Sequence, residues 1–133
     1  MSREEFHMRP IGRVATDAES VPRFYSVSDI EGALIIDEEY AAGLSDFVPG
    51  DRLNVIFAFH GSPPFDMRRL RIRTPHSGKE RGVFSTRSPV RPNPIGLSIV
   101  EVLAVRGNII EVRGLDMING TPVLDIKPVD SSG

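Results

Sequence analysis

The chain has 133 residues, a net charge of −2 and no cysteine. This length fits one domain over residues 1–133 with a core large enough to fold unaided, and the lack of cysteine excludes disulfides, thiolate metal sites and a cysteine nucleophile. No apolar run reaches the roughly 18 residues that a membrane helix needs, and the polar N-terminus does not resemble a secretory signal. We therefore expect a cytoplasmic protein with no membrane partner.

Short strand patterns dominate the first half of the chain. We expect strands at Pro10–Thr16, Ala33–Ile36 and Asp51–His60. The third stretch alternates best, because apolar side chains recur at nearly every second position along it. Between the second and third strands, Glu38–Leu44 predicts the only short helix.

The second half continues in the same way. Its expected strands are Met67–Thr74, Arg81–Arg87, the long apolar Gly96–Val105, its hairpin partner Asn108–Leu115, and a last extended piece at Thr121–Val129. The 12 glycines and 11 prolines are spread along the chain and not pooled in a linker. Many short strands separated by turn signals predict an all-β barrel or sandwich.

The basic charge is concentrated in one segment. Residues 68–91 hold eight of the 16 lysines and arginines, and their single acidic residue is Glu80. This asymmetry indicates an anionic partner better than the overall charge does. A nucleic acid fits the segment, and a solvated basic face or an acidic protein partner is the alternative.

The stretch "TRSPVRPNPIG" in this region is unusually stiff. Pro89, Pro92 and Pro94 fix their own φ angles and restrict the residues before them. Arg87 and Arg91 therefore extend from a backbone that is set before any ligand binds, which suits contact with a carboxylate or a phosphate. The alternative is a rigid surface connection with solvated arginines.

Other polar residues are candidates for chemistry. His60 ends an apolar strand, Asp116 precedes the "NG" turn, and Asp125 follows it. A hydrogen-bonded structural histidine and an exposed Asp125–Lys127 ion pair are the plain alternatives. The three histidines are scattered, so we expect no metal site.

Two motifs carry a resemblance to a known family. "GVFSTRSPVRPNPIGLS" followed by "LDMINGTPVLDIKP", with "PIGRV" and "FAFH" before them in the same order, closely resembles the TrmO/TsaA-like (YaeB-like) family of S-adenosylmethionine-dependent tRNA methyltransferases. The resemblance extends from about Pro10 to Val129. It implies a small β-barrel with proline-rich loops, a homodimer, and methyl transfer from S-adenosylmethionine to N6 of threonylcarbamoyladenosine beside the tRNA anticodon.

The resemblance also implies site residues. The expected cofactor-binding residues are Arg23, Phe24, Tyr25, His60, Gly61, Arg87, Leu97, Asp116, Met117, Ile118 and Asn119. The expected RNA-binding residues, taken from the basic segment, are Arg69, Arg71, Arg73, Lys79 and Arg91. Asp116, Asp125 and His60 are candidates for a general base, although a ureido N–H is acidic enough to make proton removal undemanding.

The chain departs from the family pattern in three places. Around residues 62–80 it reads "RLRIRTPHSGKE" and lacks the "RPPRLGG"-like stretch of members. It also has "PRFY" at residues 22–25 where members read "PRQP", and Asn119 where members have an aspartate. Two alternatives therefore stay open: an S-adenosylmethionine-binding barrel that acts on another substrate, and a non-enzymatic RNA-binding barrel.

Overall fold

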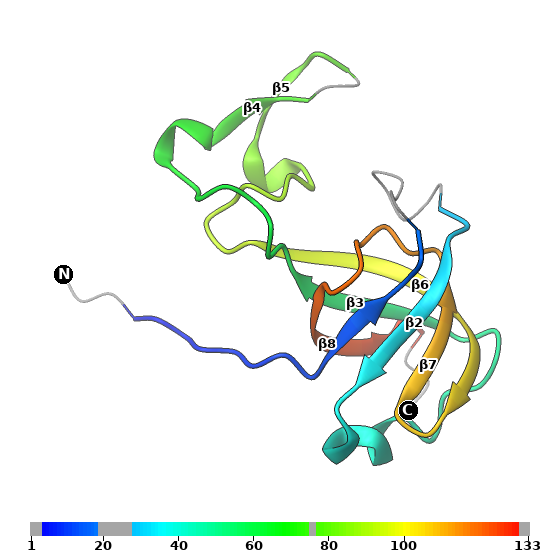
Figure 1. Cartoon of the computed structure of the whole chain (residues 1–133). Coiled ribbons are helices and arrows are strands. Elements are labelled where there is room, and N and C mark those ends of the chain that lie inside the picture. Colours follow the sequence, from blue (N-terminus) through cyan, green and yellow to red (C-terminus); the bar gives the residue numbers. More distant parts are fainter. Residues whose placement is uncertain (1–3, 19–27, 75–76, 131–133) are drawn as a thin grey trace.

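Six strands close into an antiparallel barrel in the order β1-β2-β7-β6-β3-β8 (Figure 1). The computed structural model describes residues 4–18, 28–74 and 77–130. The barrel strands are β1 (Gly12–Ala15), β2 (Glu31–Ile36), β3 (Arg52–Ala58), β6 (Ile95–Arg106), β7 (Ile109–Arg113) and β8 (Pro122–Pro128). The prediction of a small all-β barrel is confirmed, and the sandwich is not the fold.

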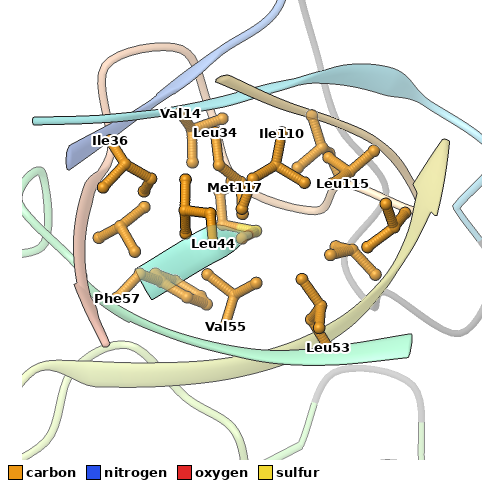
Figure 2. Close-up of a cluster of buried hydrophobic side chains, with 14 residues drawn as sticks. Val14, Leu34, Ile36, Leu44, Leu53, Val55, Phe57, Ile110, Leu115 and Met117 are labelled. Atoms are coloured by element: carbon orange, nitrogen blue, oxygen red, sulfur yellow. The ribbon is translucent and has the colours of Figure 1, made fainter. Parts of the chain in front are cut away.

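The barrel interior is filled by the inward half of each alternating strand. Along β3, Leu53, Val55 and Phe57 are buried while their neighbours are exposed or half-buried, as the period of two requires. The predicted short helix is present as a 3-10 helix, η2 (Glu38–Leu44). Figure 2 shows that Leu44 of this helix points into the barrel among the strand side chains.

The β6–β7 hairpin turns at Gly107 and Asn108, as predicted. Only Gly107 takes a positive φ, at 63°. Asn108 instead ties the turn to the next strand: its Nδ2 donates to the Ile36 carbonyl at 2.7 Å, and its own carbonyl accepts from the Ile36 amide at 2.9 Å.

Residues 59–94, here called the excursion, leave the barrel between β3 and β6. They contain η3 (Met67–Arg69), the two-stranded sheet of β4 (Arg71–Arg73) and β5 (Glu80–Gly82), and η4 (Val83–Ser85). Figure 1 shows this green part standing off one side of the barrel. Ala58 pairs with Ile95, and the Phe59 amide donates to the Pro94 carbonyl at 2.8 Å, so both ends of the excursion start from the same point on the barrel rim.

Two predicted strands of the excursion are wrong over part of their length. The first begins only at Arg71, because the Asp66 side chain accepts from the Arg68 amide at 2.9 Å and starts a 3-10 turn. The second ends at Gly82: the Thr86 hydroxyl donates to the Val83 carbonyl at 2.8 Å and closes η4. Local side-chain hydrogen bonds of this kind compete with strand pairing.

Candidate functional site

A cavity of about 1100 Å³ lies where the excursion meets the barrel. The barrel contributes Phe57, the first residues of β6 and Asp116, and the excursion contributes Phe59 and the other walls. Ligand pockets in proteins commonly span about 300–1,000 Å³, so this cavity is large enough for a cofactor together with part of a second substrate.

The floor of the cavity depends on a glycine. The rings of Phe57 and Phe59 pack edge to face, with centroids 5.1 Å apart. A Cβ atom on Gly96 would lie 2.3 Å from Cζ of Phe57 and 2.8 Å from Cζ of Phe59. Glycine at this position therefore lets β6 lie directly on the two rings, which form an apolar base.

Leu97 explains why β6 looks apolar on both faces in the sequence. Its neighbours Gly96 and Ser98 are buried, whereas Leu97 is 44% exposed and lines the cavity. Nη1 of Arg87 donates to the Leu97 carbonyl at 2.5 Å. The structure thus brings together two of the predicted cofactor-binding residues.

Asp116 reaches the same cavity from the segment between β7 and β8. The hydroxyl of Ser98, which is only 1% exposed, donates to Oδ1 of Asp116 at 2.6 Å. Both residues line the cavity. The carboxylate is therefore held at a defined place in the wall, where it can accept hydrogen bonds from a ligand.

Arginines make the cavity strongly basic. Arg69, Arg73, Arg81, Arg87 and Arg91 line it, and among its lining residues in the described part of the chain Asp116 is the single acid. Such a wall attracts phosphates and carboxylates.

Arg91 also stabilises the loop to which it belongs. Its Nη1 donates to the carbonyls of Thr86 and Ser88, at 3.0 and 3.1 Å, and its guanidinium lies 6.0 Å from the centroid of the Phe84 ring. The predicted RNA-binding arginine is thus tied to its own loop.

Other predicted residues lie elsewhere. His60 and Gly61 are exposed in the turn after β3 and do not line the cavity. Nε of Arg71 pairs with Glu80 at 3.1 Å outside the cavity wall, and Lys79 is exposed and does not line the cavity either.

The segment around Asn119 is divided between three environments. Met117 is buried in the barrel core and Ile118 is exposed. Oδ1 of Asn119 accepts from the Thr16 amide at 3.0 Å, beside a second cavity of about 620 Å³.

Asp125 is exposed and pairs with Lys127 at 3.3 Å. Arg23, Phe24 and Tyr25 lie outside the described residues.

Several cavity residues were absent from the expected set, among them Arg81, Phe84 and Ser98. The signal was present, because Phe84 and Ser98 belong to the same motif as Arg87 and Leu97 and Arg81 directly precedes that motif. The direction of the Phe84 side chain could not be predicted, because the sequence predicts a strand at Arg81–Arg87 whereas the structure has a 3-10 helix at Val83–Ser85.

Neither a metal cluster nor a membrane span is found in the part of the chain that the structure describes. No group of three or more His, Asp or Glu side chains comes together there. No helix within residues 4–18, 28–74 and 77–130 has the length and apolar character to cross a membrane.

Known proteins resemble this chain over most of its length. An S-adenosyl-L-methionine-binding protein of Archaeoglobus fulgidus is 41% identical over 90% of this chain and 86% of its own. A probable S-adenosyl-L-methionine-binding protein of Pyrococcus abyssi is 36% identical over 90% of this chain and 66% of its own. A tRNA (adenine(37)-N6)-methyltransferase of Mus musculus is 41% identical over 68% of this chain, which spans only 20% of the mouse protein.

The fold comparison agrees. A crystal structure of TrmO superposes with a TM-score of 0.69 at 26% identity, over 98% of this chain and 57% of that one. The sequence pattern of the tRNA-methyltransferase O N-terminal domain matches residues 14–131. The chain therefore belongs to the TrmO family, as its motifs predicted.

Proposed function

We propose that this protein binds S-adenosylmethionine in the basic cavity and transfers the methyl group to an adenine of tRNA, at N6 of threonylcarbamoyladenosine beside the anticodon. Family membership supports the class of reaction. The cofactor is supported by two archaeal relatives that bear the name of S-adenosyl-L-methionine-binding proteins. An adenine at position 37 and its N6 atom are supported by the name of the mouse relative, and the threonylcarbamoyl group by the resemblance of the motifs to the family.

One observation carries the proposal: Arg87 and Leu97 of the proline-rich motif and the distant Asp116 meet at one cavity that four further arginines line. The residues fit the cofactor. The apolar floor of Phe57 and Phe59 suits an adenine ring, and an arginine suits a carboxylate. A carboxylate suits ribose hydroxyls or an ammonium group.

The protein has little covalent chemistry to perform. The cofactor, when bound, supplies an activated methyl group and its leaving group. The chain must hold the two reactants in line and exclude competing geometries. Among the three candidate bases, Asp116 borders the cavity, whereas His60 and Asp125 lie outside its wall, so Asp116 is the residue we assign to contact with the reactants.

Calorimetric titration with S-adenosylmethionine tests the cofactor site. We expect binding by the wild-type protein and a loss of roughly tenfold or more in Asp116→Asn, because a charged hydrogen-bond acceptor is lost at the site. Asp125→Asn makes the same change at the exposed ion pair with Lys127 and should bind as the wild type does. Equal affinities for the two variants would remove Asp116 from the cofactor site, and no binding at all would favour the non-enzymatic barrel.

Mass spectrometry of tRNA nucleosides tests the substrate. The protein is incubated with S-adenosylmethionine and with tRNA that either carries or lacks threonylcarbamoyladenosine. We expect one added methyl group on the modified nucleoside only. Methylation of a different nucleoside would identify another substrate for the same cofactor site. The homodimer and the cytoplasmic location stay predictions.

A further inference from the structure

A large aromatic ring is left in water at the wall of the basic cavity. Phe84 is 74% exposed, whereas Val83 beside it is 1% exposed. A phenyl ring left in water gains none of the favourable free energy of burial. Single exposed apolar side chains are common on proteins, so the role of this ring follows from its place in the cavity wall and from the contacts that hold it.

The ring is held in place by the loop that carries it. Val83 anchors η4 in the protein, and the amide and hydroxyl of Thr86 both donate to the Val83 carbonyl, at 3.1 and 2.8 Å. The guanidinium of Arg91 lies over the Phe84 ring at 6.0 Å, within the range of a cation–π contact. That guanidinium is itself fixed by the Thr86 and Ser88 carbonyls. A ligand that stacks on Phe84 therefore meets a ring that is already ordered.

Other cations share the cavity with the ring. Arg69, Arg73 and Arg81 line the same cavity as Phe84. Exposed aromatic rings beside basic grooves are how proteins bind unpaired nucleotides: the ring stacks on the base and the cations contact the phosphates. A polyanion that carries flat bases matches this wall in both charge and shape.

We propose that Phe84 is the platform on which an unpaired base of the RNA substrate stacks, with the flanking phosphates held by Arg69, Arg73 and Arg81. This inference rests on the proposed function and adds to it a specific contact for the single-stranded part of the RNA. The floor rings are different: Phe57 is 4% exposed and belongs to the interior, whereas Phe84 faces solvent, where a macromolecule can reach it.

Binding of two fluorescently labelled RNAs by anisotropy tests the platform. One is a hairpin with an unpaired loop, and the other is the same stem as a blunt duplex. We expect Phe84→Ala to weaken hairpin binding by roughly tenfold, the scale of one lost base–aromatic stack, and to change duplex binding less than twofold. Phe84→Tyr should keep the affinity because it keeps the ring, and Phe84→Leu should lose it although it stays apolar.

Phe6→Ala is the matched control, because Phe6 is 82% exposed and does not line the cavity. It should bind both RNAs as the wild type does. Unfolding midpoints of all variants are measured in parallel, and the exposure of Phe84 predicts little change in them.

Several results would contradict the proposed stacking of a base on Phe84. Wild-type affinity in Phe84→Ala or in Phe84→Leu would show that no ring is needed. A change of sedimentation coefficient in Phe84→Ala would make the ring an interface between copies of the chain. A loss of S-adenosylmethionine affinity without a loss of RNA affinity would make it a cofactor contact. If the wild-type protein bound neither RNA, the proposed tRNA function would be contradicted as well. If the wild-type protein bound the hairpin and Phe84→Ala bound it equally well, only the proposed role of Phe84 would be contradicted.

Discussion

Gly96 determines the shape of the cavity by having no side chain. It lies in β6 directly over Phe57 and Phe59, with no room for a Cβ atom. The glycine of the "NPIG" motif is therefore needed for close packing and not for a turn, and its φ is not among the positive values. A side chain here must push a buried ring out of the floor.

We expect Gly96→Ala to lower the free energy of unfolding by about 1–3 kcal/mol, the cost of overpacking a core. Urea denaturation measures it. Gly43→Ala is the matched control, because a Cβ atom there meets nothing within 4 Å and the backbone is not left-handed. That variant should stay within about 0.5 kcal/mol of the wild type, and equal stability of the two variants would contradict the packing argument.

The proline-rich loop, residues 86–94, is an ordered element although it is neither helix nor strand. The Ser88 amide donates to the Thr86 hydroxyl at 3.2 Å, and the Val90 amide donates to the Ser88 hydroxyl at 3.3 Å. Arg91 adds a bridge to two carbonyls of the same loop. The prolines restrict the backbone, and these hydrogen bonds from side chains favour one conformation of it. Because the loop is already ordered, a ligand that contacts Arg87 causes little further loss of conformational entropy on binding.

Removing the bridge should loosen the loop. We expect amide hydrogen exchange at Ser88 and Val90 to become roughly tenfold faster in Arg91→Ala, because hydrogen bonds from a charged donor are lost. Arg69→Ala removes a cavity arginine for which the structure gives no hydrogen bond to this loop, and exchange there should not change. Unchanged protection in Arg91→Ala would show that the prolines alone order the loop.

The barrel and the excursion contribute different parts of the cavity wall. The barrel supplies Asp116 and the Phe57 ring of the floor, and the excursion supplies the Phe59 ring and the arginines of the wall. The basic segment of residues 68–91 falls entirely within the excursion, residues 59–94. This division explains how a chain with a net charge of −2 can offer a polyanion a strongly positive surface.

The salt dependence of RNA binding should report this surface. Single-stranded contacts release counterions with a slope of about −0.7 per phosphate in a log–log plot of affinity against salt, so three phosphate contacts predict a slope near −2. We expect Arg81→Ala to make the slope less negative by about 0.7, the value of one phosphate contact. Arg52→Ala, at the first residue of β3 and outside the cavity lining, should leave the slope unchanged. A slope near zero in the wild type would exclude phosphate contacts by the excursion.

Local patterns allowed much of the fold to be predicted. Every barrel strand was expected close to its observed bounds, because period-two alternation is set by which side chains face the core. The motif likewise located Arg87, Leu97 and Asp116. The errors were at Met67–Leu70 and Val83–Arg87, where Asp66 and Thr86 replace strand pairing with their own hydrogen bonds.

The sequence by itself therefore determined the fold class, the family, the strand positions and the segment that carries the basic charge. Only the tertiary structure decided which candidates meet. Ser98 and Asp116 are 18 residues apart and touch because β6 enters the barrel beside the β7–β8 connection. Met117 and Asp116 are adjacent in the chain, yet one fills the core and the other lines the cavity. The reason is that a side chain's surroundings depend on how the barrel closes, and closure is set by pairing between distant strands.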